Sequence, residues 1–257
     1  MKTVPNGLVK GRVLARKQWT EKLFSLEINA PVEKYLPGQF TKLGLTNEQG
    51  EWVRRAYSMV NHPGHAYGHD HLEFLIIADD NGQLSPKLHK LNEGDEVYVG
   101  QKPSGFMTLD EIPDYAKDLW LLSTGTAIGP FISMLADPSL KWRFTNITLV
   151  HAVRTSDELV YQDAINSLSR NLGDRFQYVT VVSRETHATS LQGRIPLLLA
   201  SGAIQGKVGR TFIPSESFLY ICGNPSMVKD TSQTLTDLGL VKHLRRKPGN
   251  FASENYW

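Results

Sequence analysis

Residues 119–130 have the sequence LWLLSTGTAIGP, in which an apolar run ends at a glycine-rich turn and an apolar helical stretch follows. Glycines let a dinucleotide approach the backbone closely, and the helix start beyond them favours phosphate. Ala127 stands where the common dinucleotide fingerprint often has its middle glycine, so the motif alone is weak. Its position at a strand-to-helix junction strengthens it, and it predicts the start of an α/β nucleotide-binding domain.

Strand and helix signals alternate through the residues that follow this motif. Further strands are predicted at 147–153, 176–183 and 218–222, and helices at 158–172, 195–200 and 226–238. Such alternation is typical of a parallel sheet that is covered by helices on both faces.

The first hundred residues have a different rhythm, with short strands between turns. The predicted strands are 7–19, 23–29, 39–45, 52–60, 72–78 and 96–100. They indicate a small antiparallel β-barrel. The one helix expected here is 85–91, since Ser85 suits an N-cap and Pro86 the first helical position. We therefore expect a barrel domain over 1–110 and an α/β domain over 111–257, with the junction near 105–117.

The composition narrows the classes of function. A chain of 257 residues with 40% hydrophobic content can form two modest cores. Its net charge of +2 lacks the strong basic bias of a nucleic-acid binder. The single cysteine, Cys222, can form neither an internal disulfide nor a four-cysteine iron–sulfur cluster. We see no signal peptide and no membrane-spanning run, so we expect a cytoplasmic protein with an organic cofactor for any electron chemistry.

Arg55-Ala56-Tyr57-Ser58 places three chemically distinct groups late in a predicted barrel strand. The planar arginine fork suits a diphosphate, and the tyrosine face suits a flat ring. The turn at 82–85 opens the predicted helix, where backbone N–H groups could add a second diphosphate contact. Read alone, residues 55–58 are equally compatible with an ordinary strand, and the turn at 82–85 is better explained as the start of a capped surface helix.

Arginines follow two strands of the α/β half. Arg154 follows the second strand, Ser183 and Arg184 close the third, and Arg194 comes soon after. An acidic residue at such a strand end favours NAD, whereas this set favours the 2′-phosphate of NADP. Glu185 argues for NAD unless its carboxylate points elsewhere. Any one of these arginines could also be a solvated surface charge.

Three further features have both a functional and a structural interpretation. Cys222 ends the fourth strand, either as a buried hydrophobe or beside a cofactor crevice. The tail 251–257 ends in Tyr256 and Trp257, which could stack on a cofactor or pack in a surface groove. The loop 62–71 holds four histidines, for which a solvated hairpin is favoured over a site, so no metal is expected.

Together these motifs resemble the ferredoxin/flavodoxin–NADP reductase family, especially its bacterial members that end in Tyr-Trp. The resemblance covers nearly the whole chain and rests on segments 39–44, 55–58, 82–86, 125–130, 182–186, 222–225 and 243–246. It implies a FAD-dependent enzyme that exchanges electrons between NADPH and ferredoxin or flavodoxin.

The resemblance also implies roles for individual residues. FAD would be held by Arg55, Ala56, Tyr57, Ser58, Leu75, Ile76, Ile77, Ala78, Gln83, Leu84 and Ser85, and covered by Tyr256 and Trp257. Thr126 would lie between flavin and nicotinamide. NADP would be held by Ala152, Val153, Arg154, Ser183, Arg184, Arg194, Gly223, Asn224 and Asp230. The group nearest the reaction would be Ser58, Cys222 and Glu254.

An acidic ferredoxin or flavodoxin is the expected partner, in a transient complex with a monomer. Two basic groups could steer it, or could be solvated surface charge. They are Arg12, Arg16 and Lys17, and Lys242, Arg245, Arg246 and Lys247. Two other functions stay open at this point: an NAD(P)H-dependent flavin reductase, and a non-catalytic regulator that binds flavin or nucleotide.

Overall fold

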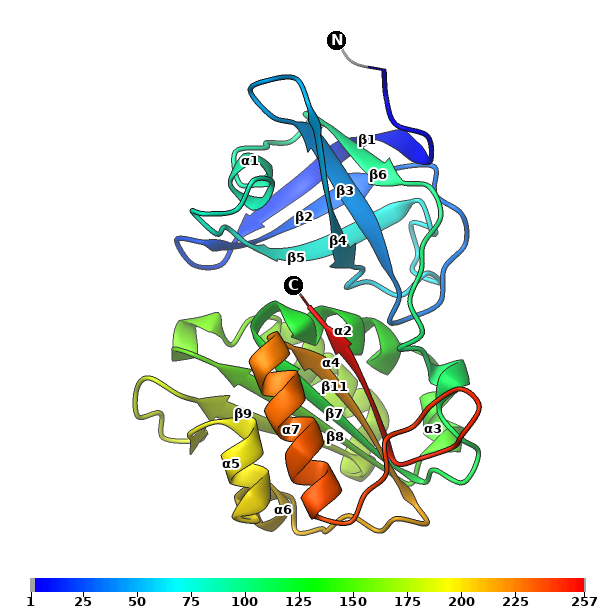
Figure 1. Ribbon diagram of the computed structural model, residues 1–257, viewed down its shortest axis with the longest axis vertical. Helices are drawn as coiled ribbons and strands as arrows, with labels where there is room; N and C mark the ends of the chain where they lie inside the picture. Colours follow the sequence, from blue (N-terminus) through cyan, green and yellow to red (C-terminus); the bar gives the residue numbers. More distant parts are fainter. Residues whose placement is uncertain (1–2, 257) are drawn as a thin grey trace.

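The computed structural model describes residues 3–256 and contains two six-stranded sheets, stacked along the long axis of the molecule (Figure 1). The first sheet is antiparallel, in the order β4-β3-β6-β1-β2-β5. Its strands are β1 (Leu8–Gln18), β2 (Leu23–Asn29), β3 (Phe40–Thr46), β4 (Trp52–Ser58), β5 (His71–Ile77) and β6 (Glu96–Gly100). Helix α1 (Ser85–Leu88) follows β5.

The two outer strands of this sheet meet, so it closes into the predicted barrel. Met59, just after β4, forms an antiparallel bridge with Phe74 of β5. Next to it, the N–H of Val60 donates to the carbonyl of Glu73 at 2.8 Å. Side chains alternate along each strand, and the inward ones form the barrel core with Tyr35, Leu84 and Leu88.

The second sheet is parallel throughout, in the order β10-β9-β8-β7-β11-β12. Its strands are β7 (Asp118–Thr124), β8 (Asn146–Val153), β9 (Phe176–Val182), β10 (Leu191–Gln192), β11 (Ser217–Gly223) and β12 (Phe251–Asn255). Its helices are α2 (Ile128–Leu135), α3 (Leu140–Arg143), α4 (Gln162–Leu172), α5 (Ile195–Ala200), α6 (Ala203–Val208) and α7 (Pro225–Asp237). The predicted fold class is confirmed.

Strand β7 shows how this sheet is covered. Leu119 and Leu121 pack in an apolar cluster with α2, α3 and α4, while Trp120 and Leu122 pack with α5, α6 and α7. The alternation puts helices on both faces, as expected for a buried parallel sheet. Chain order also reverses at β7, because β8 lies on one side and β11 on the other. Ligands bind at the carboxyl edge beside such a reversal.

Two local predictions were wrong, and one strand was not predicted. The helix predicted at 158–172 begins at Gln162, because Ser156–Glu158 forms a 3-10 turn and Tyr161 adopts φ +60°. Ser85 is not an N-cap. It lies inside α1, and its Oγ accepts the N–H of Asp79 at 3.1 Å. The C-terminal tail is the sixth strand of the parallel sheet, β12.

The two sheets are joined by apolar contacts as well as by the chain. Leu23, Val60 and Leu75 of the barrel belong to the same buried cluster as Ile128 and Phe131 of α2. The turn that begins α2 is therefore packed against the barrel. No helix of residues 3–256 is both long and apolar enough to cross a membrane.

Candidate functional site

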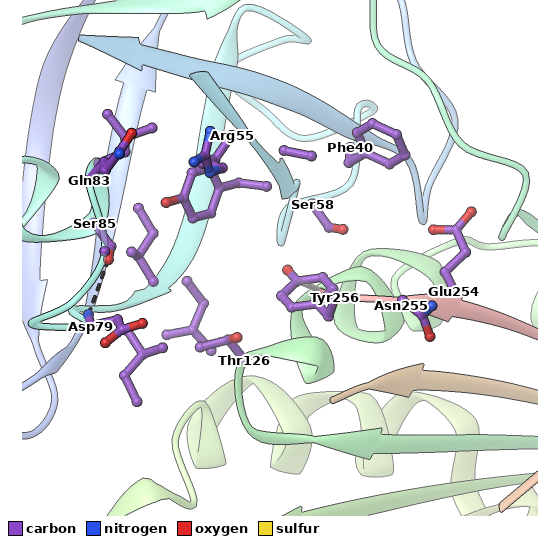
Figure 2. Close-up of a pocket in the computed structure, with 17 residues that line it drawn as sticks. Phe40, Arg55, Ser58, Asp79, Gln83, Ser85, Thr126, Glu254, Asn255 and Tyr256 are labelled. Atoms are coloured by element: carbon purple, nitrogen blue, oxygen red, sulfur yellow. Dashed lines mark hydrogen bonds between the residues drawn. The ribbon is translucent and has the colours of Figure 1, made fainter. Parts of the chain in front are cut away.

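Two adjoining cavities lie where the barrel meets the parallel sheet. The barrel cavity, of about 530 Å³, is lined by Phe40, Arg55, Ala56, Tyr57, Ser58, Leu75, Ile76, Ile77, Asp79, Gly82, Gln83, Leu84, Ser85, Thr126, Glu254, Asn255 and Tyr256 (Figure 2). The sheet cavity, of about 370 Å³, lies at the carboxyl edge and is lined chiefly by segments 124–126, 152–154, 183–184, 193–196 and 224–230. Ile77 and Thr126 line both cavities, so the two meet at these side chains.

The structure brings together most of the residues singled out from the sequence. Those in the barrel cavity are Arg55, Ala56, Tyr57, Ser58, Leu75, Ile76, Ile77, Gln83, Leu84, Ser85, Thr126, Glu254 and Tyr256. Those in the sheet cavity are Thr126, Ala152, Val153, Arg154, Ser183, Arg184, Arg194, Asn224 and Asp230. Ala78, Cys222 and Gly223 line neither cavity, and Trp257 lies outside the described residues.

Sequence reasoning missed several residues that line the cavities. Phe40 and Asn255 reach the barrel cavity only through the fold, from β3 and from the end of β12. Asp79 could have been found, because it lies just before the turn 82–85 that was singled out. Glu158 and Met227 line the sheet cavity, and no spacing in the sequence marks them.

One end of the barrel cavity offers donors for an anion. Arg55 uses Nη1 to donate to the carbonyl of Arg54 at 2.8 Å, and its guanidinium lies over the cavity (Figure 2). Across from it, the N–H groups of Gln83 and Leu84 have no hydrogen-bond acceptor within residues 3–256. A cationic fork that faces free backbone donors suits a diphosphate.

The turn at Gly82 leaves little space for a larger residue. A Cβ there would lie 2.9 Å from Ser85 Oγ and 3.0 Å from the carbonyl oxygen of Asp79. The same Ser85 Oγ accepts the N–H of Asp79 at 3.1 Å, which fixes the turn from within. The fold therefore presents the free donors at 83–84 in one conformation.

The middle of the barrel cavity is flat and largely apolar. Burial raises the pKa of Tyr57 to about 12, so its ring is a neutral wall beside Leu75–Ile77. Tyr256 lies below Ser58 and beside Thr126 (Figure 2), and its N–H donates to the carbonyl of Gly223 at 3.0 Å. Burial also raises the pKa of the Tyr256 phenol, whereas hydrogen bonding with Ser58 lowers it. Two aromatic side chains and an aliphatic strand suit a planar heterocycle.

Strand β12 carries an acidic residue to the same cavity. Glu254 is in parallel register with Cys222 of β11, and its Oε1 accepts the N–H groups of Phe106 and Met107 at 3.1 and 3.2 Å. Burial raises the pKa of Glu254, and the two N–H donors oppose the rise. Cys222 is fully buried, which raises the pKa of its thiol and keeps it protonated.

The sheet cavity gathers three arginines whose guanidinium groups form no direct hydrogen bond or ion pair with the described residues. Within residues 3–256, the guanidinium groups of Arg154, Arg184 and Arg194 form no hydrogen bond or ion pair, and all three residues are exposed. Glu158 does line this cavity, where its carboxylate accepts the N–H of Arg154 at 2.9 Å. Glu185 does not, because its carboxylate accepts the N–H of Ser156 at 2.6 Å.

The histidine loop lies away from both cavities. His71 Nε2 lies 2.8 Å from Glu27 Oε2, and its ring contacts the rings of His65 and Tyr67. Across the described chain, no three His, Cys, Asp or Glu side chains are grouped so as to hold a metal ion.

Comparison with known proteins places both halves in oxidoreductase families. The family described as "Oxidoreductase FAD-binding domain" matches residues 15–106, and "Oxidoreductase NAD-binding domain" matches residues 121–233. The chain is 45% identical to a flavodoxin/ferredoxin–NADP reductase of Escherichia coli over 97% of this chain and 98% of that one. It is 40% identical to the protein of that name from Buchnera aphidicola, over 98% and 100%. A crystal structure of a ferredoxin NADP⁺ reductase from Neisseria gonorrhoeae, with bound FAD and NADP, superimposes with a TM-score of 0.90 at 34% identity, covering 98% of this chain and all of that one.

Proposed function

The chain belongs to the ferredoxin/flavodoxin–NADP reductase family, and we propose that it exchanges electrons between NADPH and a ferredoxin or flavodoxin through bound FAD. Bound FAD would accept a hydride, two electrons at once, and release electrons singly to the carrier. The protein's own part is to bind and align the two nucleotides and to exclude water from the contact.

We propose that FAD occupies the barrel cavity. Arg55 and the N–H groups at 83–84 would bind its diphosphate, with Ser85 holding their turn. Tyr57 and the strand residues Leu75, Ile76 and Ile77 would pack along the ring, with the small Ala56 beside them. Ser58 would hydrogen-bond near the reactive nitrogen and Glu254 would complete that end of the site, with the buried Cys222 beside Glu254 on the neighbouring strand.

We propose that NADPH occupies the sheet cavity, with its adenosine 2′-phosphate among the three free guanidinium groups. Ala152, Val153, Ser183, Asn224 and Asp230 would form the rest of its wall, and Thr126 would lie between nicotinamide and flavin. Tyr256 covers the ring position, so it has to move before nicotinamide can lie there. That movement would gate hydride transfer, and Trp257 would extend the cover.

The three unpaired guanidinium groups are the single observation that carries the NADPH assignment. A phosphate that bridges Arg184 and Arg194 would gain charge-assisted hydrogen bonds that the 2′-hydroxyl of NADH cannot replace. The purified protein should have a flavin spectrum, and NADPH should bleach the flavin band in a stopped-flow trace. A flavin band that NADPH leaves unchanged would refute the reductase.

Cofactor preference is tested separately with the double substitution Arg184→Ala and Arg194→Ala. Losing charge-assisted contacts of about 1.5–3 kcal/mol each should raise KM for NADPH by at least tenfold and leave KM for NADH nearly constant. Arg170→Ala is the control, since this exposed arginine donates to Ser167 on α4 and lines neither cavity. An unchanged NADPH/NADH ratio in the double variant would favour an NAD(P)H-dependent flavin reductase instead.

We further propose that an acidic carrier docks transiently on the basic turn 242–247 of a monomer in the cytoplasm. Arg245 stacks on Phe106 at 4.4 Å and lies 3.1 Å from Glu111. Phe106 is 60% exposed, and its N–H donates to Glu254 of the barrel cavity, so this turn adjoins the proposed flavin position. The other basic group is less free, because Arg16 donates to the carbonyl of His89.

Charge reversal separates the two basic groups. Arg246→Glu with Lys247→Glu should raise KM for the carrier severalfold and flatten its dependence on salt, because steering charges act mainly on association. Arg12→Glu is the matched control, and flavin reduction by NADPH should stay normal in both variants. A larger effect in the control would move the docking surface to β1.

We also assign residues 1–110 to the flavin-binding unit and 111–257 to the NADP-binding unit.

A further inference from the structure

A buried histidine lies behind the glycine turn that begins α2. His151 of β8 is fully buried. Its Nε2 lies 3.2 Å from the carbonyl oxygen of Gly125, and its Nδ1 lies 3.3 Å from the hydroxyl of Tyr178 on β9. That hydroxyl accepts a hydrogen bond from Gln162 Nε2, at the start of α4, at 3.2 Å. These contacts form one chain of hydrogen bonds from α4 through two strands to the turn.

The direction of these hydrogen bonds follows from the Gly125 end and from the charge of the ring. Burial lowers the pKa of His151 to about 4, so the imidazole is neutral near pH 7 and has one N–H. The carbonyl of Gly125 can only accept, so that proton is on Nε2, and Nδ1 accepts from the Tyr178 hydroxyl. The Nε2 of Gln162 in turn donates to the Tyr178 oxygen.

This chain of hydrogen bonds matters because it ends at Gly125, next to a residue that lines both cavities. Thr126 is one of the two side chains that line both cavities. Gly125 has φ +54°, and its carbonyl accepts the N–H of Ile128 within the turn. His151 supplies a second contact to the same carbonyl oxygen, from the side of the sheet.

We propose that Gln162, Tyr178 and His151 are positioning residues that hold the Gly125–Ala127 turn, and with it Thr126, at the boundary between the two cofactor positions. The proposal rests on the proposed function, in which Thr126 lies between nicotinamide and flavin. Hydride transfer is steeply sensitive to how its two reacting atoms are placed. A loosened turn therefore slows transfer, while the arginines at the far end of the sheet cavity still bind NADPH.

The holoenzyme carrying Tyr178→Phe gives the direct test, because the substitution removes one hydroxyl and leaves the ring. The limiting rate of flavin reduction at saturating NADPH should fall by about three- to tenfold, as expected for one lost hydrogen bond. The NADPH concentration for half-maximal rate should stay within about twofold. The long-wavelength charge-transfer absorbance between nicotinamide and flavin should weaken, because it depends on their stacking.

Matched variants separate positioning from stability. Tyr115→Phe removes a hydroxyl that donates to the carbonyl of Gly249 at 2.7 Å, away from the turn, and should keep the charge-transfer band. Gln162→Ala combined with Tyr178→Phe should cost little more than either alone, since both break the same chain. His151→Gln keeps a donor for Gly125 and should be milder than His151→Ala.

The outcomes are distinct. A Tyr178→Phe enzyme that melts earlier but keeps its reduction rate and charge-transfer band would overturn the proposal and leave His151 a purely stabilising residue. Full additivity of the Gln162 and Tyr178 substitutions would overturn it as well. A wild-type protein whose flavin is not reduced by NADPH would instead refute the proposed function.

Discussion

Replacing Tyr161 with phenylalanine should weaken the junction between the two halves of the molecule. Tyr161 precedes α4, and its hydroxyl donates to Glu73 Oε1 on β5 at 2.6 Å. Its ring also contacts Trp19 at 4.9 Å between ring centroids. The hydrogen bond therefore connects the parallel-sheet half to the barrel strand that also carries Leu75–Ile77.

The magnitude follows from the burial of the acceptor. Burial raises the pKa of Glu73, and the hydrogen bond from Tyr161 opposes the rise. A hydrogen bond to a charged group contributes about 1.5–3 kcal/mol, so Tyr161→Phe should lower the free energy of unfolding by roughly 2 kcal/mol at pH 7. The substitution also raises the pKa of Glu73 further. Since protonated Glu73 loses only a neutral hydrogen bond, the destabilisation should shrink as pH falls through the raised folded pKa toward the unfolded value of about 4.3.

Urea unfolding of the holoenzyme at pH 7 and pH 5 measures this effect through the transition midpoint at constant slope. Tyr35→Phe is the control, because the buried Tyr35 hydroxyl donates to the neutral carbonyl of Asn61 at 3.2 Å. The control should cost about 1 kcal/mol at either pH. Equal losses for the two variants, or a Tyr161→Phe loss that does not change with pH, would show that Glu73 is not a charged acceptor.

Three further outcomes follow from single positions. The folded pKa of His151, about 4, lies below its ordinary value of 6.5, so the stability that depends on the neutral ring is complete above pH 6.5 and is lost as pH falls toward 4. Between these two pH values, urea titrations should show the wild type losing roughly 3 kcal/mol more unfolding free energy than His151→Gln. Gly38→Ala should lower Tm markedly or prevent folding, because φ is +96° and a Cβ would lie 2.0 Å from the carbonyl oxygen of Met107. Calorimetry measures Tm, and a near-native Tm would contradict this prediction. Glu254→Ala leaves the N–H groups of Phe106 and Met107 without their acceptor, so hydrogen exchange at both amides should speed up, and unchanged protection would refute that account.

Most of the fold could be predicted because its signals are local. Residues 23–29 and 96–100 coincide with β2 and β6, and alternation of strand and helix indicated a parallel sheet. Strand β12 was missed because its sequence FASEN has no strand-like alternation. Its conformation comes from pairing with β11, about thirty residues earlier, and that tertiary contact overrides local preference.

The residues of the candidate site likewise fall into those that short sequence motifs reveal and those that only the fold brings to the site. Short motifs such as Arg55–Ser58 and Ser183–Arg184 could be read directly, since their chemistry lies in adjacent residues. Phe40 reaches the barrel cavity through the register of β3 with β4, which places it opposite Ser58 and which no local pattern encodes. The side-chain direction of Glu185 was equally hidden, because its carboxylate accepts the N–H of Ser156 and does not line the sheet cavity.

The barrel cavity is completed by the other half of the molecule. Thr126 reaches it from the turn after β7, and Glu254, Asn255 and Tyr256 reach it from the end of β12. Each of these depends on a tertiary contact, because β12 is held by register with β11 and the turn is held by His151 and the shared apolar cluster. A change in how the two halves dock would therefore alter the proposed flavin environment and the proposed NADPH path together, since both cavities meet at Ile77 and Thr126. Electron exchange between two nucleotides needs that coupling, because neither cavity alone fixes the distance between their reacting atoms.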